Sequence, residues 1–239
     1  MKKIIGIIGR PDINITGKKV FITIEYFKDI TIDFNCLPIG ILPNIKDVKQ
    51  KLNNKEINEL NSILKICDGI ILQGGEDYYD YDKVVLKYAI DNDIPVLGIC
   101  LGSQVMASLY ENNIVEVDLK KYNNHNQEKK YSHSIIIDKN SKLYEILKKE
   151  KINVNSYHKE RIKKPGIYTV SAYSPDGIIE TLEYNKNRFN IGVQFHPEKN
   201  FKDKNMYKIF EAFFNTVKKD HACWRKILNS VGVNDILIL

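Results

Sequence analysis

The sequence predicts an α/β fold, a three-layer sandwich with a mostly parallel central sheet. Short, uninterrupted apolar runs such as Ile4–Ile8 and Gly69–Leu72 are typical of strands buried on both faces. Between such runs, apolar residues recur at helical spacing, as in Lys55–Ile66. This alternation indicates a parallel sheet covered by helices on both faces. With 239 residues, 43% of them hydrophobic, the chain is long enough to bury such a core.

The first half of the chain supplies the parallel strands in this interpretation. Ile4–Ile8 ends at a Gly-Arg-Pro turn, and Gly69–Leu72 ends just before the glycine pair Gly74-Gly75. The other elements expected here are strands at 37–42 and 95–99 and helices at 55–66, 84–90 and 101–110.

The second half is richer in strand patterns and contains a long amphipathic helix, expected at 203–218. No linker or change in composition divides the chain, so residues 1–220 are predicted to form one domain followed by a tail, 221–239. The apolar end of the tail leaves packing on the domain and packing on a second subunit equally open. The other expected elements are strands at 134–138, 152–155, 167–172, 178–184 and 190–195, and a helix at 141–149 capped by Ser141.

Composition excludes several classes of protein. The net charge of +6 is scattered, without a basic stripe interleaved with aromatic residues, which argues against nucleic-acid binding. No run of about 18 apolar residues is present, so no membrane-spanning helix is expected. The amino terminus lacks the pattern of a signal peptide, and the four cysteines show no paired spacing. We therefore expect a cytoplasmic protein.

The strongest chemical signal surrounds Cys100, where a predicted strand runs directly into a predicted helix. Gly98 and Gly102 flank the cysteine in a G-x-C-x-G pattern, which is typical of the elbow that presents a nucleophile. At a helix N-terminus, the dipole and the free N–H groups favour the reactive thiolate. The N–H of Leu101 is expected to face a developing oxyanion. On this stretch alone, a buried structural cysteine is an equally good interpretation.

A second motif, after the last predicted strand of the sheet, supplies a base for this cysteine. Pro197 separates His196 from Glu198 and is expected to keep the segment extended, so that both side chains address the same side. Glu198 would accept a hydrogen bond from one ring nitrogen and leave the other facing the thiol. The predicted catalytic triad is Cys100–His196–Glu198.

The glycine pair Gly74-Gly75 stands at the carboxyl end of another predicted strand, where ligands bind in open α/β sheets. A backbone N–H of the pair is expected to be the second oxyanion donor. Taken by itself, the pair favours an ordinary tight turn.

Together these motifs resemble the class I glutamine amidotransferase-like family and, within it, the γ-glutamyl-hydrolase branch, peptidase family C26. The resemblance implies a triad that hydrolyses the side-chain amide of a γ-glutamyl group through a thioester, without metal or organic cofactor. It also implies that Gln104 and His158 belong to the substrate pocket, and that Leu101 and Gly74 or Gly75 supply the oxyanion donors. The matching stretches are Gly74-Gly75-x-Asp77, Gly98-Ile-Cys100-Leu-Gly102-Ser-Gln104, Val154-Asn-Ser156-Tyr-His158, Asp176-Gly177-Ile-Ile-Glu180 and Gln194-Phe-His196-Pro-Glu198.

The leaving group on the γ-glutamyl nitrogen stays open. Hydrolases of γ-glutamyl amines usually carry Arg after the nucleophile, whereas Leu101 resembles ammonia-producing glutaminase domains. A γ-glutamyl amine hydrolase and a glutaminase subunit with a separate synthase partner are therefore both alternatives to a free-standing hydrolase of a small γ-glutamyl substrate. A homodimer is equally open. The family resemblance extends to the enzyme type that cleaves γ-glutamyl-CDP-amidate in capsule modification.

Two loops rich in Lys and Arg, within residues 112–131 and 158–164, favour such an anionic leaving group if they face the cleft. Solvated lysines at the surface are the simpler interpretation of the same residues. The residues concerned are Lys120, Lys121, Lys129, Lys130, Lys159, Arg161, Lys163 and Lys164.

Two further polar groups give weaker signals. His125 and His133 lack the cysteine or carboxylate spacing of a zinc site, so no metal is expected. An acidic loop is interpreted as a solvated rim or, alternatively, as a lip that recognises an amine. Its carboxylates are Glu76, Asp77, Asp80 and Asp82.

Overall fold

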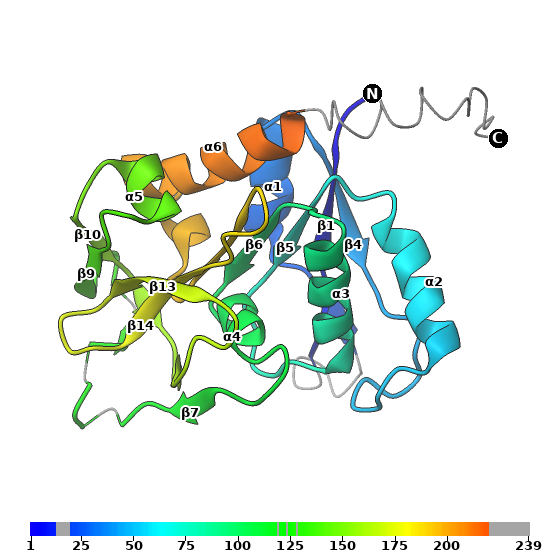
Figure 1. The fold of residues 1–239 in the computed structure, drawn as a ribbon, viewed down its shortest axis with the longest axis horizontal. Coiled ribbons are helices and arrows are strands. Elements are labelled where there is room, and N and C mark those ends of the chain that lie inside the picture. The colour runs from blue at the N-terminus through cyan, green and yellow to red at the C-terminus, as the bar shows by residue number, and fades with distance from the viewer. Residues whose placement is uncertain (13–19, 119, 123, 128, 220–239) are drawn as a thin grey trace.

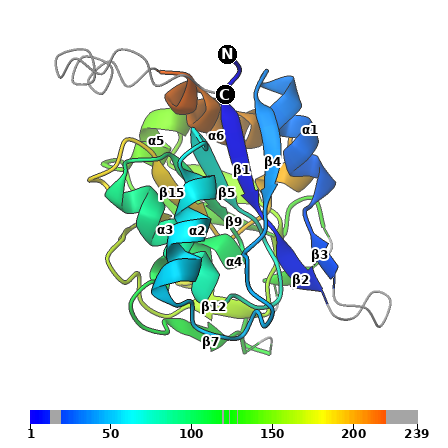
Figure 2. The same cartoon turned by 90° about the vertical axis from the view of Figure 1, so that its right-hand side faces the viewer.

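A nine-stranded sheet forms the centre of the protein, with the strand order β10-β9-β13-β14-β15-β6-β5-β1-β4. The computed structural model describes residues 1–219, apart from 13–19, 119, 123 and 128, so the tail expected at 221–239 lies outside the described residues. Helices lie on both faces of the sheet (Figures 1 and 2). The predicted α/β fold with a large central sheet is confirmed.

The sheet has a parallel half and an antiparallel half that meet at β15. All residues of β5, β6 and β15 are buried, as expected for strands covered on both faces. The parallel strands are β4 (Leu37–Ile41), β1 (Ile4–Ile8), β5 (Gly69–Leu72), β6 (Val96–Ile99) and β15 (Asn190–Val193). The antiparallel strands are β14 (Ile179–Glu183), β13 (Thr169–Tyr173), β9 (His133–Ile137) and β10 (Lys151–Val154).

Two apolar cores, one on each face of the sheet, fix the positions of the helices. In one core, Phe34, just after α1, stacks on Phe214 of α6 with ring centroids 4.4 Å apart. The helices of this core are α1 (Glu25–Asp33), α5 (Lys142–Leu147) and α6 (Lys204–Lys218). The helices of the other core are α2 (Asn54–Leu64), α3 (Asp80–Asp91) and α4 (Leu101–Ala107).

Side-chain caps define where several helices begin. The Ser141 hydroxyl accepts from the Tyr144 N–H at 3.0 Å, which confirms the predicted N-cap of α5. Asn53 and Glu56 form a reciprocal capping box at α2. None of the described helices is both long and apolar enough to cross a bilayer.

Short strand pairs outside the central sheet were not predicted, because strands of two or three residues leave no periodic pattern. The helix α1 was also missed. The short pairs are β2 (Arg10–Asp12) with β3 (Val20–Ile22), β7 (Ile114–Glu116) with β12 (Glu160–Ile162), and β8 (Asn126–Gln127) with β11 (Ser156–Tyr157).

Candidate active site

Cys100 lies on a sharp turn between β6 and α4, at the carboxyl end of the parallel strands. Its backbone has φ 51° and ψ −106°, a conformation that a residue with a side chain adopts only at a cost. The Cys100 N–H donates to the Val193 carbonyl at 2.8 Å. The Ser103 N–H and hydroxyl donate to the Cys100 carbonyl at 3.0 and 2.7 Å. These hydrogen bonds hold the thiol at the start of a helix, on the predicted elbow.

The glycines that flank Cys100 are required by close packing. A Cβ atom at Gly102 would lie 1.9 Å from the carbonyl oxygen of Leu72 in β5. A Cβ atom at Gly98 would lie 2.8 Å from the Met106 sulfur. Because the first contact is with backbone that cannot move aside, the G-x-C-x-G pattern reflects packing as well as chemistry.

His196 and Glu198 follow β15, the strand next to β6. His196 Nδ1 and Glu198 Oε1 are 2.6 Å apart, and both side chains are buried. The expectation of an extended segment was wrong, because Pro197–Asn200 is a short 3-10 helix, η1. Proline suits the first position of a helical turn, where its φ is favourable and no N–H is needed. The turn brings the carboxylate back onto the imidazole.

The electrostatics of His196 suit proton exchange with the thiol. Burial lowers the pKa of His196, but the Glu198 carboxylate and the Cys100 thiolate outweigh burial and raise the pKa to about 10. Gly74, which follows β5, packs against both His196 and Cys100. A Cβ atom at Gly74 would lie 3.1 Å from His196 Cε1 and 3.6 Å from Cys100 Cβ. The residues that follow β5, β6 and β15 are therefore neighbours at the carboxyl ends of these strands.

The predicted oxyanion donors flank this point. Leu101 is the first residue of α4, so its N–H has no carbonyl partner within the helix. Gly74 is buried with Cys100 among its nearest neighbours, whereas Gly75 is exposed and lies nearest to Arg10 and Leu101. Of the glycine pair, Gly74 is therefore the better candidate for the donor.

The amide side chains of Gln194 and Asn155, which were not predicted as site residues, support the candidate triad. Gln194 Nε2 lies 3.7 Å from Cys100 Sγ, and Gln104 Nε2 lies 3.4 Å from Gln194 Oε1. Asn155 holds the His196 backbone from both sides, since it donates to the carbonyl and accepts from the N–H, each at 2.8 Å. In the sequence, the only indication of a role for Gln194 and Asn155 is that both lie within stretches that resemble the family.

The thiol opens into a cavity of about 500 Å³ whose charged lining residues are mainly acidic. Burial, and after it the neighbouring carboxylates, raise the pKa of Glu160. The charged lining residues are Glu76, Asp77, Glu116, Glu160 and Lys159.

The basic and acidic loops differ from their expected arrangement. Among the eight basic residues expected near the mouth, Lys159 is the one that lines this cavity. Arg161 lies over the Tyr122 ring, 5.8 Å from its centroid. The acidic loop is not a uniform solvated rim, because Asp82 is fully buried and paired with Arg10.

His158 lines the cavity, as the resemblance implied, but its ring is engaged elsewhere. Nδ1 lies 2.9 Å from the Glu160 carbonyl oxygen, and Nε2 lies 3.2 Å from His125 Nδ1. A direct role for its ring in substrate binding therefore stays a prediction.

Comparison with known proteins decides the family. The model of the peptidase C26 family matches residues 79–198, just over half of the chain. The chain belongs to the peptidase C26 family. The matched span includes the elbow at Cys100 and ends at Glu198, so it contains the whole candidate triad. Peptidases of this family and the glutamine-hydrolyzing relatives are enzymes that cleave amide bonds.

Two relatives illustrate this kinship. A CTP synthase from Porphyromonas gingivalis is 30% identical over 217 residues, which cover 72% of this chain and 40% of that protein. The C26 chain thus spans less than half of the CTP synthase that it matches. One subunit of the glutamine-hydrolyzing GMP synthase from Methanococcus aeolicus is 31% identical over 163 residues, which cover 68% of this chain and 76% of that protein.

Solved structures show the same fold. The glutaminase domain of Trypanosoma brucei CTPS with bound acivicin superposes with a TM-score of 0.63 at 18% identity, covering 92% of this chain and 96% of that one. A glutamine amidotransferase from Thermotoga maritima gives a TM-score of 0.53 at 18% identity, covering 97% and 96%.

Proposed function

We propose that this C26 protein is a cysteine amidohydrolase that cleaves the amide bond of a small γ-glutamyl compound and releases glutamate. The observation that carries the proposal is the meeting of Cys100, His196 and Glu198 beside a cavity. The buried carboxylate fixes the imidazole through Nδ1, so Nε2 is the nitrogen left for the thiol.

In the proposed cycle, His196 takes the Cys100 proton and the thiolate attacks the amide carbon. The Leu101 and Gly74 N–H groups stabilise the oxyanion. The C–N bond breaks as His196 gives its proton to the leaving nitrogen, and a thioester remains. Water then gives a proton to His196 and attacks the thioester, and the C–S bond breaks to release glutamate and restore the thiol.

The charge of the cavity supports a substrate whose leaving group carries positive or no charge. Four carboxylates and one ammonium group line the cavity, so Coulomb attraction favours the α-ammonium group of a glutamyl moiety or a cationic amine. An anionic leaving group, such as that of γ-glutamyl-CDP-amidate, was expected from the basic loops. The lining gives it no support, because seven of those eight residues are not among the residues that line the cavity.

A second candidate is a glutaminase that delivers ammonia to a separate synthase chain. Leu101 favours this function, as does the similarity to CTP synthase and to the glutamine-hydrolyzing GMP synthase. Glutamine hydrolysis that is negligible for the protein alone but rises with an added synthase chain would favour the second candidate over the first.

The experiment compares kcat/KM for glutamine, a γ-glutamyl amine and an anionic γ-glutamyl conjugate at two salt concentrations. Wild type is expected to prefer the first two substrates. Asp77→Asn should weaken the preference for the cationic amine, and Lys159→Gln, a matched change of opposite sign, should strengthen it. A clear preference for the anionic conjugate would overturn the proposed charge selectivity.

Covalent labelling tests the nucleophile independently of the substrate. Acivicin, the compound bound to the T. brucei glutaminase domain, is expected to add to Cys100 of wild type and not to modify Cys100→Ala. Mass spectrometry of the intact protein and its peptides gives the site. Undiminished amide hydrolysis by Cys100→Ala would refute the assignment.

A further inference from the structure

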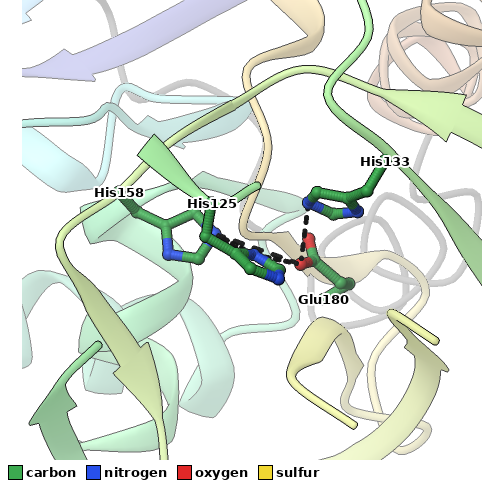
Figure 3. A group of neighbouring side chains, drawn as sticks. All are labelled: His125, His133, His158 and Glu180. Atoms are coloured by element: carbon green, nitrogen blue, oxygen red, sulfur yellow. Dashed lines mark hydrogen bonds and ion pairs between the residues drawn. The ribbon is translucent and has the colours of Figure 1, made fainter. Parts of the chain in front are cut away.

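Three histidines and one glutamate gather in the antiparallel half of the protein, outside the candidate triad (Figure 3). Each offers one ligand atom, and these four atoms lie within 4.8 Å of one another. The residues come from four separate segments. Three of them are buried, with exposed fractions of 0% for His125, 3% for His158 and 1% for Glu180, and His133 is partly buried, with 7% of its side chain exposed. We call the group of His125, His133, His158 and Glu180 the histidine–glutamate cluster.

Hydrogen bonds outside the cluster fix the protonation of its three imidazoles. His158 Nδ1 lies 2.9 Å from the Glu160 carbonyl oxygen, and His133 Nδ1 lies 3.2 Å from the Ser134 carbonyl oxygen. A carbonyl oxygen only accepts, so both Nδ1 atoms carry the proton and both Nε2 atoms carry a lone pair. His125 has the reverse arrangement, with Nε2 3.0 Å from an Asp176 carboxylate oxygen. With one proton on each ring, the nitrogen that faces the cluster is a lone-pair donor in all three rings.

Glu180 adds a carboxylate to these three lone pairs. Its two oxygens are buried without a hydrogen-bond partner among the described residues, as is His133 Nε2. Glu180 Oε1 lies 3.5 Å from His125 Nδ1, 3.5 Å from His133 Nε2 and 4.0 Å from His158 Nε2 (Figure 3). A buried carboxylate is costly without a donor or a cation. Lone pairs and an anion that converge on one point lack a positive partner at their centre.

Three of the distances within the cluster are close to those between the ligands of one metal ion, and the four ligand atoms as a set lie within 4.8 Å of one another. Zn²⁺ binds imidazole nitrogen and carboxylate oxygen at about 2.0–2.2 Å, which places neighbouring ligands of a tetrahedron roughly 3.3–3.6 Å apart. His125 Nδ1 and His158 Nε2 are 3.2 Å apart, and two of the three histidine–glutamate distances are 3.5 Å. We propose that the histidine–glutamate cluster binds one divalent transition-metal ion, with Zn²⁺ the ion that its donor set fits best.

The surroundings of the cluster match this assignment. The carboxylate of Asp176 on His125 and the two backbone carbonyls on the other rings are the outer partners that metal-binding histidines ordinarily have.

The proposed ion has a structural role and takes no part in the proposed cycle. With four protein ligands, the site is closed, as structural zinc sites are. The ion would tie the loop around His125 to β9, to β14 and to residues 155–158 after β10. That last segment carries Asn155, which holds the His196 backbone, so the metal would steady one wall of the active site. The proposal goes beyond the proposed function and reverses the expectation that no metal binds.

The test measures metal content on the full-length protein, purified without chelator and after removal of any histidine tag. Inductively coupled plasma mass spectrometry is expected to find about one equivalent of zinc per wild-type chain. Glu180→Gln and His133→Ala should each lower it at least tenfold. His196→Ala is the matched control, a buried histidine outside the cluster, and should keep the full equivalent.

Cobalt substitution gives a second measurement that does not depend on how well the variants fold. Wild type stripped of metal and reloaded with Co²⁺ is expected to show the intense visible bands of a tetrahedral ion. Substoichiometric metal in wild type, both as purified and after reloading, would overturn the proposal and favour a protonated Glu180 that hydrogen-bonds to a histidine. Equal metal in wild type and both cluster variants would also overturn it. Neither result affects the labelling of Cys100, so the two proposals fail separately.

Discussion

Two buried groups of histidine and glutamate are linked by residues 155–158, since Asn155 holds the His196 backbone and His158 belongs to the histidine–glutamate cluster, and the two groups have opposite electrostatics. At the candidate triad, one histidine stands between a carboxylate and a thiol, and its pKa is raised to about 10 although burial acts against it. In the histidine–glutamate cluster, three histidines share one carboxylate, and the pKa of His133 falls to about 4 and that of His158 to about 3.

Burial lowers the pKa of the histidines in both groups; at His196 the carboxylate and the thiol outweigh burial, whereas at His133 and His158 burial prevails. Glu198 lies 2.6 Å from His196 and stabilises its protonated form, so this histidine can hold and release a proton. The cluster histidines give their protons to oxygens outside the cluster and direct lone pairs inward. The same two residue types thus form a proton carrier in one place and a cation site in the other.

The largest effect that separates the two groups is expected from His196→Ala. Loss of the general base should lower kcat by roughly 10⁴- to 10⁶-fold, because the members of a triad act as a unit. Steady-state kinetics with glutamine or the best γ-glutamyl substrate give the measurement. Circular dichroism and metal content should stay at wild-type values, and a drop of less than tenfold would remove His196 from the triad.

Glu198→Gln is expected to lower kcat by about 10³- to 10⁴-fold, because the amide no longer stabilises the imidazolium. The change should also alter the pH dependence of stability. A histidine whose pKa is raised from 6.5 to about 10 stabilises the fold fully below pH 6.5, and this contribution is lost as the pH rises through about 10. Denaturant unfolding between pH 6 and pH 10 should show a steeper decline for wild type than for the variant. Parallel curves would contradict the ion pair.

Gln194→Leu removes the amide that lies 3.7 Å from the thiol sulfur. A hydrogen bond to a charged group contributes roughly 1.5–3 kcal/mol, so kcat should fall about 10- to 100-fold with little change in KM. Gln50→Leu is the control, since its amide bonds to Glu56 away from the site. Wild-type kinetics for Gln194→Leu would show that the contact with Cys100 has no catalytic consequence.

The smallest effect is expected from Asn155→Ala, which cuts the link between the two groups. Two buried hydrogen bonds to the His196 backbone are lost, which should lower the free energy of unfolding by about 2 kcal/mol and kcat by about tenfold. Denaturant unfolding and kinetics check both values. Metal content should be unchanged, because Asn155 is not a member of the cluster, and a loss of metal would mean that the two groups are not separate.

The parallel half of the fold and the candidate residues of the triad could be read from the sequence because their signals are local; the catalytic roles of these residues stay a prediction. Strands such as β1 and β5 are continuous apolar runs, and the structure gives both with the predicted bounds. The elbow places its two glycines and its cysteine within five residues. By contrast, α1 was missed because its β-branched residues favour strand, and the stacking of Phe34 on Phe214 outweighs that preference.

The histidine–glutamate cluster could not be predicted because its members are far apart in the sequence. The antiparallel pairing of β9 with β13 and of β13 with β14 brings His133 close to Glu180. Neither residue has a neighbour in the sequence that suggests a ligand set. Local spacing therefore rejected a metal at His125 and His133, although tertiary structure gathers four ligand atoms there.

The left-handed backbone of Cys100 has a consequence for how sequences with this fold can change. That conformation costs of order 1–3 kcal/mol for any residue with a side chain, and glycine adopts it freely. Cys100→Gly should therefore raise thermal stability while it removes the nucleophile. At this position the fold and the reaction therefore favour different residues, and the elbow gives up folding stability for turnover.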